Sequence, residues 1–305
     1  MNRADIIGAE SFERGQRVEF WKMNGAGNDF IILNNLVEKL PESAFPALAR
    51  RLCERHLSIG ADGLIVVDAA QDRGDYRMRF YNSDGSLGEM CGNGARYGYE
   101  TGLAGEKQTV ETTAGIVTGV RISERLYRVR LNDPSVVKLN CPVEVDGTAW
   151  PCSYVELGNP GIPHAVIPYP GLRQADETQL RELGRRLRHH PAFSKGANVN
   201  FYELTGEDTL WERTFERGVE DFTYACGTGT GSVVTVLTLQ GKVSGKAVKV
   251  QMTGGELIID AKRRGSRVER LFLTGPTNIV CKGRITDETL PPDSGTGCGP
   301  DAVLS

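Results

Sequence analysis

The sequence predicts an α+β fold made of two pseudo-symmetric domains, each a strand-rich closed sheet around a central helix headed by a cysteine. Two short Cys-Gly stretches begin at Cys91 and Cys226, an offset of 135 positions, and each runs into small or apolar residues. Glycine accounts for 37 of the 305 residues, which favours many tight turns between short strands. A repeat of this kind indicates a duplicated architecture.

Other motifs recur at nearly the same offset. Four further pairs of similar segments follow in the same order, at offsets between 134 and 140: Leu52 with Leu187, residues 60–62 with 196–198, residues 79–81 with 213–215, and residues 113–115 with 253–255. Chance explains any one of these matches but not the ordered series. The repeat therefore sets the division of the chain.

The chain divides into two halves, residues 17–132 and 133–274, and its length suits two domains with a core each. A last strand near residues 277–285 is expected to return to the first half. Residues 1–16 are expected to form a polar N-terminal extension. Residues 286–305, rich in Pro, Gly and Ser, are expected to form a flexible tail.

Apolar spacing and turn residues place the elements of the first half. The prediction is strands at 18–21 and 30–33 around a glycine-rich turn, a helix at 43–55, strands at 64–67 and 76–81, the first cysteine-headed helix at 92–101, and two or more strands within 110–131. A turn at Asn82–Gly85 leads towards Cys91.

The second half repeats this scheme. Its predicted elements are strands at 153–157 and 165–167 around the loop 158–164, a helix at 177–188, strands at 198–203 and 209–215, strands within 248–273, and the returning strand at 277–282. Residues 232–239 are β-branched and strand-like in propensity. Because they follow Cys226 and its glycines at the repeat offset, we predict a buried helix there.

Composition and charge narrow the function. The 36 basic and 39 acidic residues give a net charge of −3, which offers no field for nucleic acid or an anionic membrane. No apolar run approaches the roughly 18 residues of a spanning helix, and residues 1–16 lack a signal peptide's apolar core. Seven cysteines without a C-x-x-C pair argue against a disulfide framework or a zinc site. We therefore expect a cytoplasmic protein with no metal and no nucleic-acid or membrane partner, and a homodimer is left open.

A cysteine at a helix start meets unpaired backbone N–H groups and the positive end of the helix dipole, which favours the thiolate. The same N–H groups bind a carboxylate or a phosphate. Two such cysteines, Cys91 and Cys226, fit removal of a proton from one face of a carbon and delivery to the other face. That reaction is racemisation or epimerisation without a cofactor. The plainer alternative is a pair of buried cysteines that cap repeated helices.

Other cysteine and glycine chemistries fit less well. Four residues separate Cys91 from Arg96, one fewer than in a cysteine phosphatase loop. The run Gly227–Gly231 lacks the following Lys of a nucleotide-binding P-loop. Cys–His hydrolysis needs one nucleophile and one base, so it leaves the second cysteine unexplained.

Seven motifs in fixed order span residues 19–283: Gly25–Phe30, Gly60–Gly63, Tyr81–Ser86, Cys91–Arg96, Gly196–Asn198, Glu216–Gly218 and Ala225–Gly229. In these motifs the chain resembles the diaminopimelate epimerase family, whose members are pyridoxal-phosphate-independent, two-cysteine amino-acid epimerases and racemases with two pseudo-symmetric domains. The resemblance implies epimerisation of LL-diaminopimelate to meso-diaminopimelate by two thiols, without a cofactor, for the supply of lysine and peptidoglycan precursors.

The resemblance also implies roles for named residues. Cys91 and Cys226 would be the acid–base pair, and His164 and Glu216 would tune the two thiols. The substrate-binding residues would be Asn28, Asn82, Gly92, Asn93, Asn159, Asn198, Glu216, Arg217, Gly227 and Thr228.

The chain departs from the family pattern in a second-half loop. The family has Gly-Asn-Pro-His there, whereas four residues separate Asn159 from His164 in this chain. On the repeat offset Ile162 takes the family Asn position, and Asn159 reaches the site only if the loop folds back. Gly63 and Tyr97 also differ from frequent family residues. These departures leave open a racemase of another amino acid and a non-catalytic amino-acid-binding homologue. A related isomerase that uses a carboxylate is disfavoured by the two cysteines.

Overall fold

The computed structural model describes residues 18–88, 92–113 and 115–286. The predicted N-terminal extension, all but the first residue of the predicted tail, and Cys91 therefore lie outside the described residues.

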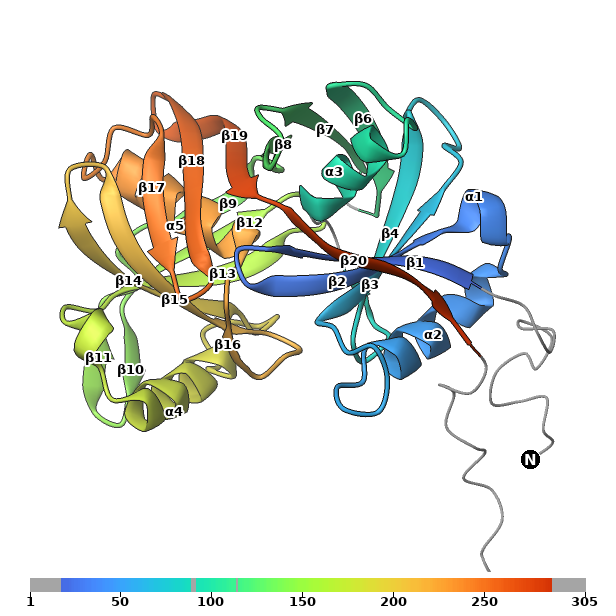
Figure 1. Cartoon of the computed structure of the whole chain (residues 1–305). Helices are drawn as coiled ribbons and strands as arrows, with labels where there is room; N and C mark the ends of the chain where they lie inside the picture. The colour runs from blue at the N-terminus through green and yellow to red at the C-terminus, as the bar shows by residue number, and fades with distance from the viewer. Residues whose placement is uncertain (1–17, 89–91, 114, 287–305) are drawn as a thin grey trace, which may run out of the picture.

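The described residues form two strand-rich lobes, and the two-half α+β prediction is confirmed (Figure 1). The strands of each lobe curl around one helix, which is α3 (Gly92–Glu100) in the first half and α5 (Gly227–Leu239) in the second. Both helices begin where the sequence places the glycines that follow its two repeated cysteines.

Besides α3, the described residues of the first half form two short α-helices and the 3-10 helix η1 (Glu42–Ala44). In chain order its other elements are β1 (Val18–Gly25), β2 (Asn28–Asn34), α1 (Asn35–Glu38), α2 (Phe45–Leu52), β3 (Gly63–Asp68), β4 (Tyr76–Asn82), β5 (Leu87–Gly88), β6 (Lys107–Thr112), β7 (Gly115–Arg121) and β8 (Leu126–Arg130). Helix α2 is shorter than the predicted 43–55. The chain turns back after Leu52, whose carbonyl accepts a hydrogen bond from the Gly60 N–H at 2.9 Å.

The second half contains strands that the sequence did not predict, namely β9 (Pro134–Lys138), the hairpin β10 (Val143–Val145) and β11 (Thr148–Trp150), and β16 (Asp221–Thr223). Its other described elements are β12 (Ser153–Leu157), β13 (Ile162–Pro168), the 3-10 helix η2 (Leu172–Gln174), α4 (Glu177–Arg188), β14 (Asn198–Gly206), β15 (Thr209–Glu216), β17 (Val248–Met252), β18 (Gly255–Arg264) and β19 (Arg267–Pro276). The last strand of the chain is β20 (Asn278–Ile285).

The two halves share one pattern of strand pairing. In the first, β1–β2 is antiparallel, β2–β3 parallel, β3–β4 antiparallel and β4–β6 parallel, followed by the antiparallel pairs β6–β7 and β7–β8. In the second, β12, β13, β14, β15, β17, β18 and β19 pair in the same sequence of orientations. The pairing therefore repeats the duplication seen in the sequence.

Three further pairings complete the sheet. The last strand, β20, pairs antiparallel with β1, so the end of the chain returns to the first half. Strand β9 pairs with β12 in the equivalent place of the second half. The repeat did not predict the third link, in which β8 pairs with β19 and joins the two sheets into one of 18 strands.

The core of the second half surrounds α5. Every residue from Gly229 to Thr238 is buried in this helix. A helix that is covered on all sides needs no polar face, so β-branched residues are tolerated where packing decides the conformation. This environment is the reason why a strand-like segment forms a helix.

The loop predicted at 158–164 is shorter in the structure. Ile162 already pairs with Leu157 in the β12–β13 hairpin, so the connecting turn comprises only residues 158–161. The peptide bond between Asn159 and Pro160 is cis. His164 lies within β13, where it is fully buried.

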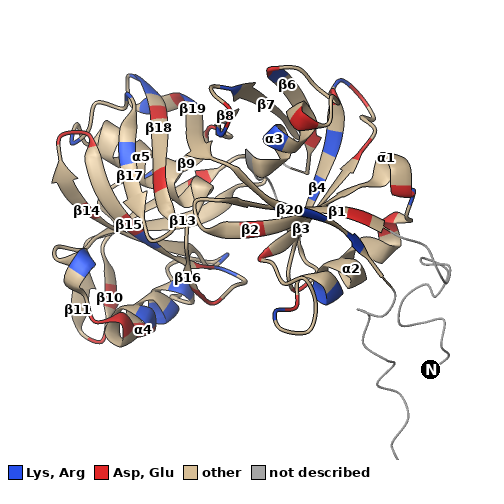
Figure 2. Cartoon of the chain, viewed as in Figure 1, with Lys and Arg blue, Asp and Glu red and all other residues tan. Residues whose placement is uncertain are grey.

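Basic and acidic residues are interspersed along both lobes (Figure 2). On α4, four arginines pair with nearby carboxylates, among them Arg181 with Asp221 at 2.7 Å and Arg188 with Glu220 at 3.0 Å. No helix within the described ranges is long and apolar enough to cross a membrane.

Candidate active site

A cavity of about 250 Å³ lies where the two halves meet. Seven of the residues singled out in the sequence line it, and they come from both halves: Asn28, Asn82, Asn93, Glu216, Cys226, Gly227 and Thr228. The tip of the β1–β2 hairpin, the end of β4 and the start of α3 supply the first three. The end of β15 and the start of α5 supply the others.

The first turn of α5 presents Cys226 and free backbone N–H groups to this cavity. Cys226 is the N-cap residue, with extended backbone angles of φ −132 and ψ 103, and its side chain is 7% exposed. Its Sγ lies 3.6 Å from the Thr228 Oγ1. The leading N–H groups of a helix lack internal partners, so this turn suits an anion such as a carboxylate.

The Cys226 thiol differs from the expectation that a helix start favours the thiolate. Burial raises the pKa of Cys226 well above its usual value, and the Glu216 carboxylate adds to the rise. Hydrogen bonds from Thr228 and from the Gly229 N–H only partly oppose this effect. Loss of water therefore outweighs the helix dipole, and the resting group is a neutral thiol.

Glu216 ends β15 beside Cys226 and is half-buried. Burial raises the pKa of its carboxyl, while a hydrogen bond with Thr223 lowers it. A carboxylate at the wall of a cavity suits a bound ammonium group, and a cation there would offset the cost of burial.

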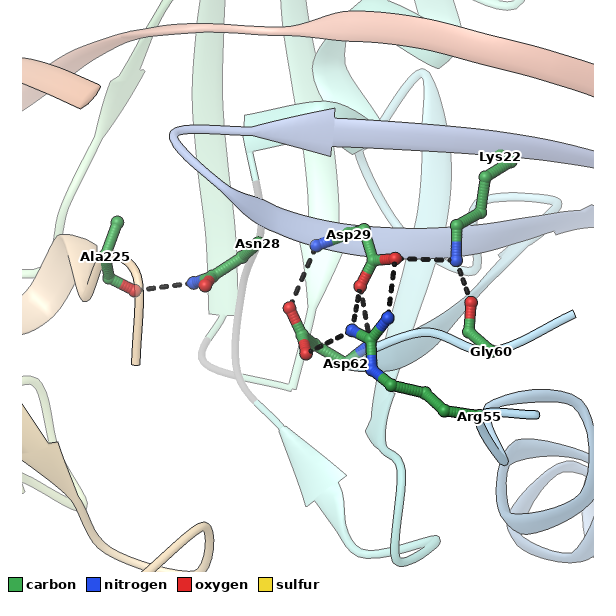
Figure 3. A network of polar contacts seen from close by, with 7 residues as sticks. All are labelled: Lys22, Asn28, Asp29, Arg55, Gly60, Asp62 and Ala225. Atoms are coloured by element: carbon green, nitrogen blue, oxygen red, sulfur yellow. Dashed lines mark hydrogen bonds and ion pairs between the residues drawn. The ribbon is translucent and has the colours of Figure 1, made fainter. Parts of the chain in front are cut away.

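Asn28, in the first half, contacts Ala225 in the second half (Figure 3). Its Nδ2 donates a hydrogen bond of 2.5 Å to the carbonyl of Ala225, the residue before Cys226. A close backbone approach supports this contact, because a Cβ at Gly254 would lie 1.8 Å from the Ala26 carbonyl oxygen. The β1–β2 hairpin tip therefore touches the second half.

An ion-pair network holds the strand that carries Asn28 (Figure 3). Asp29 pairs with Lys22 at 2.8 Å and with Arg55 at 2.6 Å, and Arg55 also reaches Asp62 at 2.9 Å. Burial alone would raise the pKa of Asp29, but hydrogen bonds from Lys22 and Arg55 hold it below the usual value. The network fixes the start of β2 against the segment before β3.

The first half also contributes Asn82 and the start of α3. The Asn82 Nδ2 donates to the Ser86 Oγ at 2.9 Å, within the turn that follows β4. Gly92 begins α3, and Asn93 follows it with only 2% of its surface exposed. Cys91, the residue before this helix, lies outside the described residues.

His164 and Asn198 are buried behind the cavity wall, and neither lines the cavity in the described structure. Burial lowers the pKa of His164 to about 3, with the Arg217 charge as a second cause, so the ring is neutral. The Asn198 Oδ1 accepts a hydrogen bond from the Arg217 N–H at 2.8 Å. Asn198 therefore holds the backbone just after Glu216.

Arg217 and Asn159 lie outside the cavity wall as the described residues define it. The Arg217 side chain is exposed and donates to the Lys195 carbonyl at 3.2 Å. Asn159 is exposed in the 158–161 turn, so the loop is not folded back towards Cys226.

The cavity also has lining residues that sequence reasoning missed. Asp62, Ser83 and Thr223 add polar groups. The motif at residues 60–62, which recurs at 196–198, was the available signal for Asp62. The apolar part of the wall comes from several strands and both halves: Phe30, Phe80, Val129, Leu131, Leu257 and Leu273. Among the described residues, no group of three or more His, Cys, Asp or Glu side chains is arranged to hold a metal ion.

Comparison with known proteins gives a consistent set of similarities. The family model described as diaminopimelate epimerase matches residues 20–134 and 157–280. A diaminopimelate epimerase of Aquifex aeolicus is 38% identical over 288 residues, which cover 90% of this chain and 99% of that protein. One of Methanothrix thermoacetophila is 37% identical and covers 90% of this chain and 98% of its own.

Solved structures resemble the fold at lower identity. A probable proline racemase from Agrobacterium radiobacter K84 superposes with a TM-score of 0.65 at 16% identity, over 88% of this chain and 93% of its own. A hydroxyproline epimerase from Agrobacterium vitis gives a TM-score of 0.64, also at 16% identity, over 90% and 94%. These two similarities concern the arrangement of the chain.

Proposed function

The chain belongs to the diaminopimelate epimerase family, and from this premise we propose that it interconverts LL- and meso-diaminopimelate with two thiol groups, one of which removes the Cα proton while the other donates a proton to the opposite face. It is an isomerase. The observation that carries the proposal is the position of Cys226. Its neutral thiol, the start of α5 and the Glu216 carboxyl face one cavity between the halves.

The cavity offers a place for each charged group on the reacting carbon. We place the substrate α-carboxylate at the N–H groups that begin α5 and, by the repeat, at those that begin α3 after Gly92. The α-ammonium then lies at Glu216. Negative charge that develops as the Cα–H bond breaks is stabilised by the two helix starts.

The two thiols take opposite roles in one turnover. Cys226 starts as a neutral thiol, so it donates its proton to one face of the carbanion. Cys91, its counterpart in the repeat, is the thiolate that removes the proton from the other face. After one inversion the Cys226 proton is on the product carbon, Cys91 carries the proton removed from the substrate and Cys226 is the thiolate, and the reverse reaction restores the starting state.

We assign the remaining residues to the distal half of the substrate. Asn28 and Asn82 line the first-half wall, and Asn28 also carries the contact to the Ala225 carbonyl. Asn198 acts through the Arg217 backbone, which it holds. The guanidinium of Arg217 is free to turn towards a distal carboxylate, because its one side-chain hydrogen bond is to an exposed carbonyl.

A cytoplasmic location is part of the proposal. The five cysteines in the described part of the chain are all free thiols, although Cys141 and Cys152 are hydrogen-bonded to each other. Free neighbouring thiols are typical of a reducing compartment.

Incubation of the purified protein with LL-diaminopimelate in D2O, without added cofactor, tests the function. We expect meso-diaminopimelate to form, with deuterium at the inverted carbon, because the donating thiol exchanges with solvent. Chiral chromatography with mass spectrometry measures both. If diaminopimelate is not inverted and a screen finds another amino acid that is, the substrate assignment is wrong and the two-thiol chemistry stands. Exchange into no amino acid would contradict both.

Replacement of Asn159 tests the second-half turn. Because Asn159 is exposed in the turn and does not line the cavity within the described structure, we expect Asn159→Ala to leave kcat/KM on LL-diaminopimelate within about twofold of wild type. Asn82→Ala removes a lining amide and is the matched comparison, with an expected loss of about tenfold. A larger loss in Asn159→Ala than in Asn82→Ala would mean that the turn closes over the substrate.

A further inference from the structure

A buried polar cluster lies behind Cys226, on one face of three neighbouring strands. Asn200 on β14 is paired directly opposite Thr214 on β15, and Asn198 is paired with His164 on β13. Residues two apart on a strand share a face, so Glu212 belongs to the same face as Thr214. Glu212, Asn200 and His164 have no exposed surface.

Glu212 is unusual because the described residues offer no cation to its carboxyl group. No ion pair among the described residues includes Glu212. Its Oε2 has no hydrogen-bond partner in the described structure. Its contacts are hydroxyl groups, that of Thr214, whose Oγ1 lies 3.3 Å from Oε1, and that of Thr230. An ionised carboxylate without a cation is strongly disfavoured in such a site.

The hydrogen bonds of this cluster have one consistent direction. The Thr214 hydroxyl has a single hydrogen, and the Asn200 Oδ1, 3.0 Å away, can only accept it. The contact between Glu212 and Thr214 then needs a hydrogen from Glu212 itself, which requires the protonated acid. The Asn200 Nδ2 in turn lies 3.3 Å from the His164 Nδ1 and donates to it, which places the ring proton on Nε2.

The cluster touches the first turn of α5. A Cβ at Gly229 would lie 2.2 Å from the Asn200 Oδ1 and 3.2 Å from both the Thr214 Oγ1 and the Cys226 Sγ, so these groups meet at that glycine. The Thr230 hydroxyl, which contacts Glu212, also donates to the Cys226 carbonyl at 2.9 Å. The carboxyl of Glu212 is therefore linked to Cys226 through a single side chain.

We propose that Glu212 is a positioning residue of the Cys226 site, which as a neutral acid heads a hydrogen-bond chain through Thr214 and Asn200 to His164, and whose ionisation breaks this chain and disfavours the Cys226 thiolate. Ionised Glu212 would take the Thr214 hydrogen for itself and leave the Asn200 Oδ1 without a donor. The inference rests on the proposed function only for its effect on turnover. The ionisation of Glu212 and its effect on the thiol can be measured without any substrate.

The burial of Glu212 also affects its pKa. Burial raises the pKa of Glu212 to about 8, and the Thr230 and Thr214 hydroxyl groups, from which the ionised form would accept hydrogen bonds, lower it in part. Among the described residues, the other titratable groups on this face are Tyr202 from β14, which is paired directly opposite Glu212, His164 from β13, Glu216 from β15 and Cys226 from α5. The neutral ring of His164 leaves Glu216 and Glu212 as the two carboxyls whose charge acts on Cys226.

Alkylation of Cys226 with iodoacetamide, followed by peptide mass spectrometry across a range of pH, tests the effect on the thiol. Wild type and Glu212→Gln should react at the same rate well below the pKa of Glu212, because Glu212 is neutral in both. Well above it, only wild type carries a charge behind the thiol. Glu212→Gln should then react about threefold to tenfold faster. A rate ratio that stays constant with pH would overturn the proposal.

Thermal unfolding provides a second measurement that needs no reaction. The pKa of Glu212 in the folded protein, about 8, lies above its ordinary value of 4.5. Between these values the folded state binds the proton that the unfolded state has lost, so wild-type stability falls as pH rises. The melting temperature of Glu212→Gln minus that of wild type should grow across this window and level off above it. A difference that does not change with pH contradicts the raised pKa.

Two controls separate the possible failures. Glu203→Gln removes a carboxyl from β14 that accepts a hydrogen bond from the Gly171 N–H and faces away from the cluster, so both readouts should match wild type.

Thr214→Val interrupts the hydrogen-bond chain and leaves Glu212 in place. It should lower kcat several-fold at all pH values, whereas Glu212→Gln, which still donates through its amide, should keep kcat at neutral pH. If the alkylation ratio changes with pH as expected but diaminopimelate is not turned over, the proposed substrate is wrong and the inference about Glu212 holds. If diaminopimelate is turned over but the alkylation ratio stays constant with pH, the proposed function holds and the inference about Glu212 is wrong.

Discussion

Cys226→Ser is expected to lower kcat for diaminopimelate inversion by about 10² to 10⁴, the range that a positioned acid or base contributes. A hydroxyl is a far weaker acid than a thiol, so it cannot protonate the carbanion at the required rate. Cys226 is buried in the cavity wall, so another proton donor cannot easily take its place when it is replaced. Steady-state kinetics on both isomers measure the effect.

The same variant separates a two-thiol mechanism from a single-thiol mechanism. With Cys226 replaced, Cys91 still serves one face of the carbon, so one isomer should exchange its α-hydrogen with solvent without inverting. Cys91→Ser should show the opposite preference. Cys281→Ser, which changes an exposed cysteine on β20, is the control and should behave as wild type. Inversion at near-wild-type rates in either catalytic variant would refute the acid–base assignment.

Gly229→Ala is expected to lower kcat by about 10² while the protein stays folded. The new Cβ would lie 2.2 Å from the Asn200 Oδ1, and Asn200 is held by the Ala165 carbonyl at 3.0 Å. The first turn of α5 must therefore shift, and it carries the Cys226 sulfur and the N–H groups of the anion site with it. A displacement of about 1 Å at a reacting group is enough for a loss of this size.

Gly105→Ala is the matched control for this variant, because a Cβ at Gly105 meets no atom within 4 Å. Kinetics and circular dichroism of both variants decide the interpretation. If Gly229→Ala keeps its wild-type kcat, the first turn of α5 tolerates movement and the Cys226 geometry is less restrictive than we argue. If it unfolds, the close contact serves stability and not the position of the thiol.

The sequence alone was enough to predict the two-half architecture, several elements and part of the cavity wall. The offset between Cys91 and Cys226 predicted two similar halves, and the same order of parallel and antiparallel strand pairs occurs in both. Turn residues and apolar spacing placed the 153–157 strand and the 177–188 helix at their observed ends. The family resemblance carried by short glycine-rich motifs also identified much of the polar cavity wall, since a turn that positions a functional group is encoded within a few residues.

Tertiary packing decided several features that the sequence pattern alone does not specify. The β-branched segment 232–239 became a helix because the whole sheet of the second half covers it, and only the repeat pointed that way. The thiol of Cys226 is neutral because it loses water to residues from distant strands, which outweighs the helix dipole that the sequence makes visible. Asn159 was placed outside the cavity by the hairpin register.

The link between β8 and β19, the apolar wall of the cavity and the cluster headed by Glu212 depend on the tertiary structure alone. Each joins residues from several strands, and in the sequence Glu212 looks like an ordinary charged residue of a half-exposed strand. A carboxyl group becomes a neutral acid only when surrounding elements remove water from it and supply no cation. Those conditions are set by which strands become neighbours, so they arise only once the chain has folded.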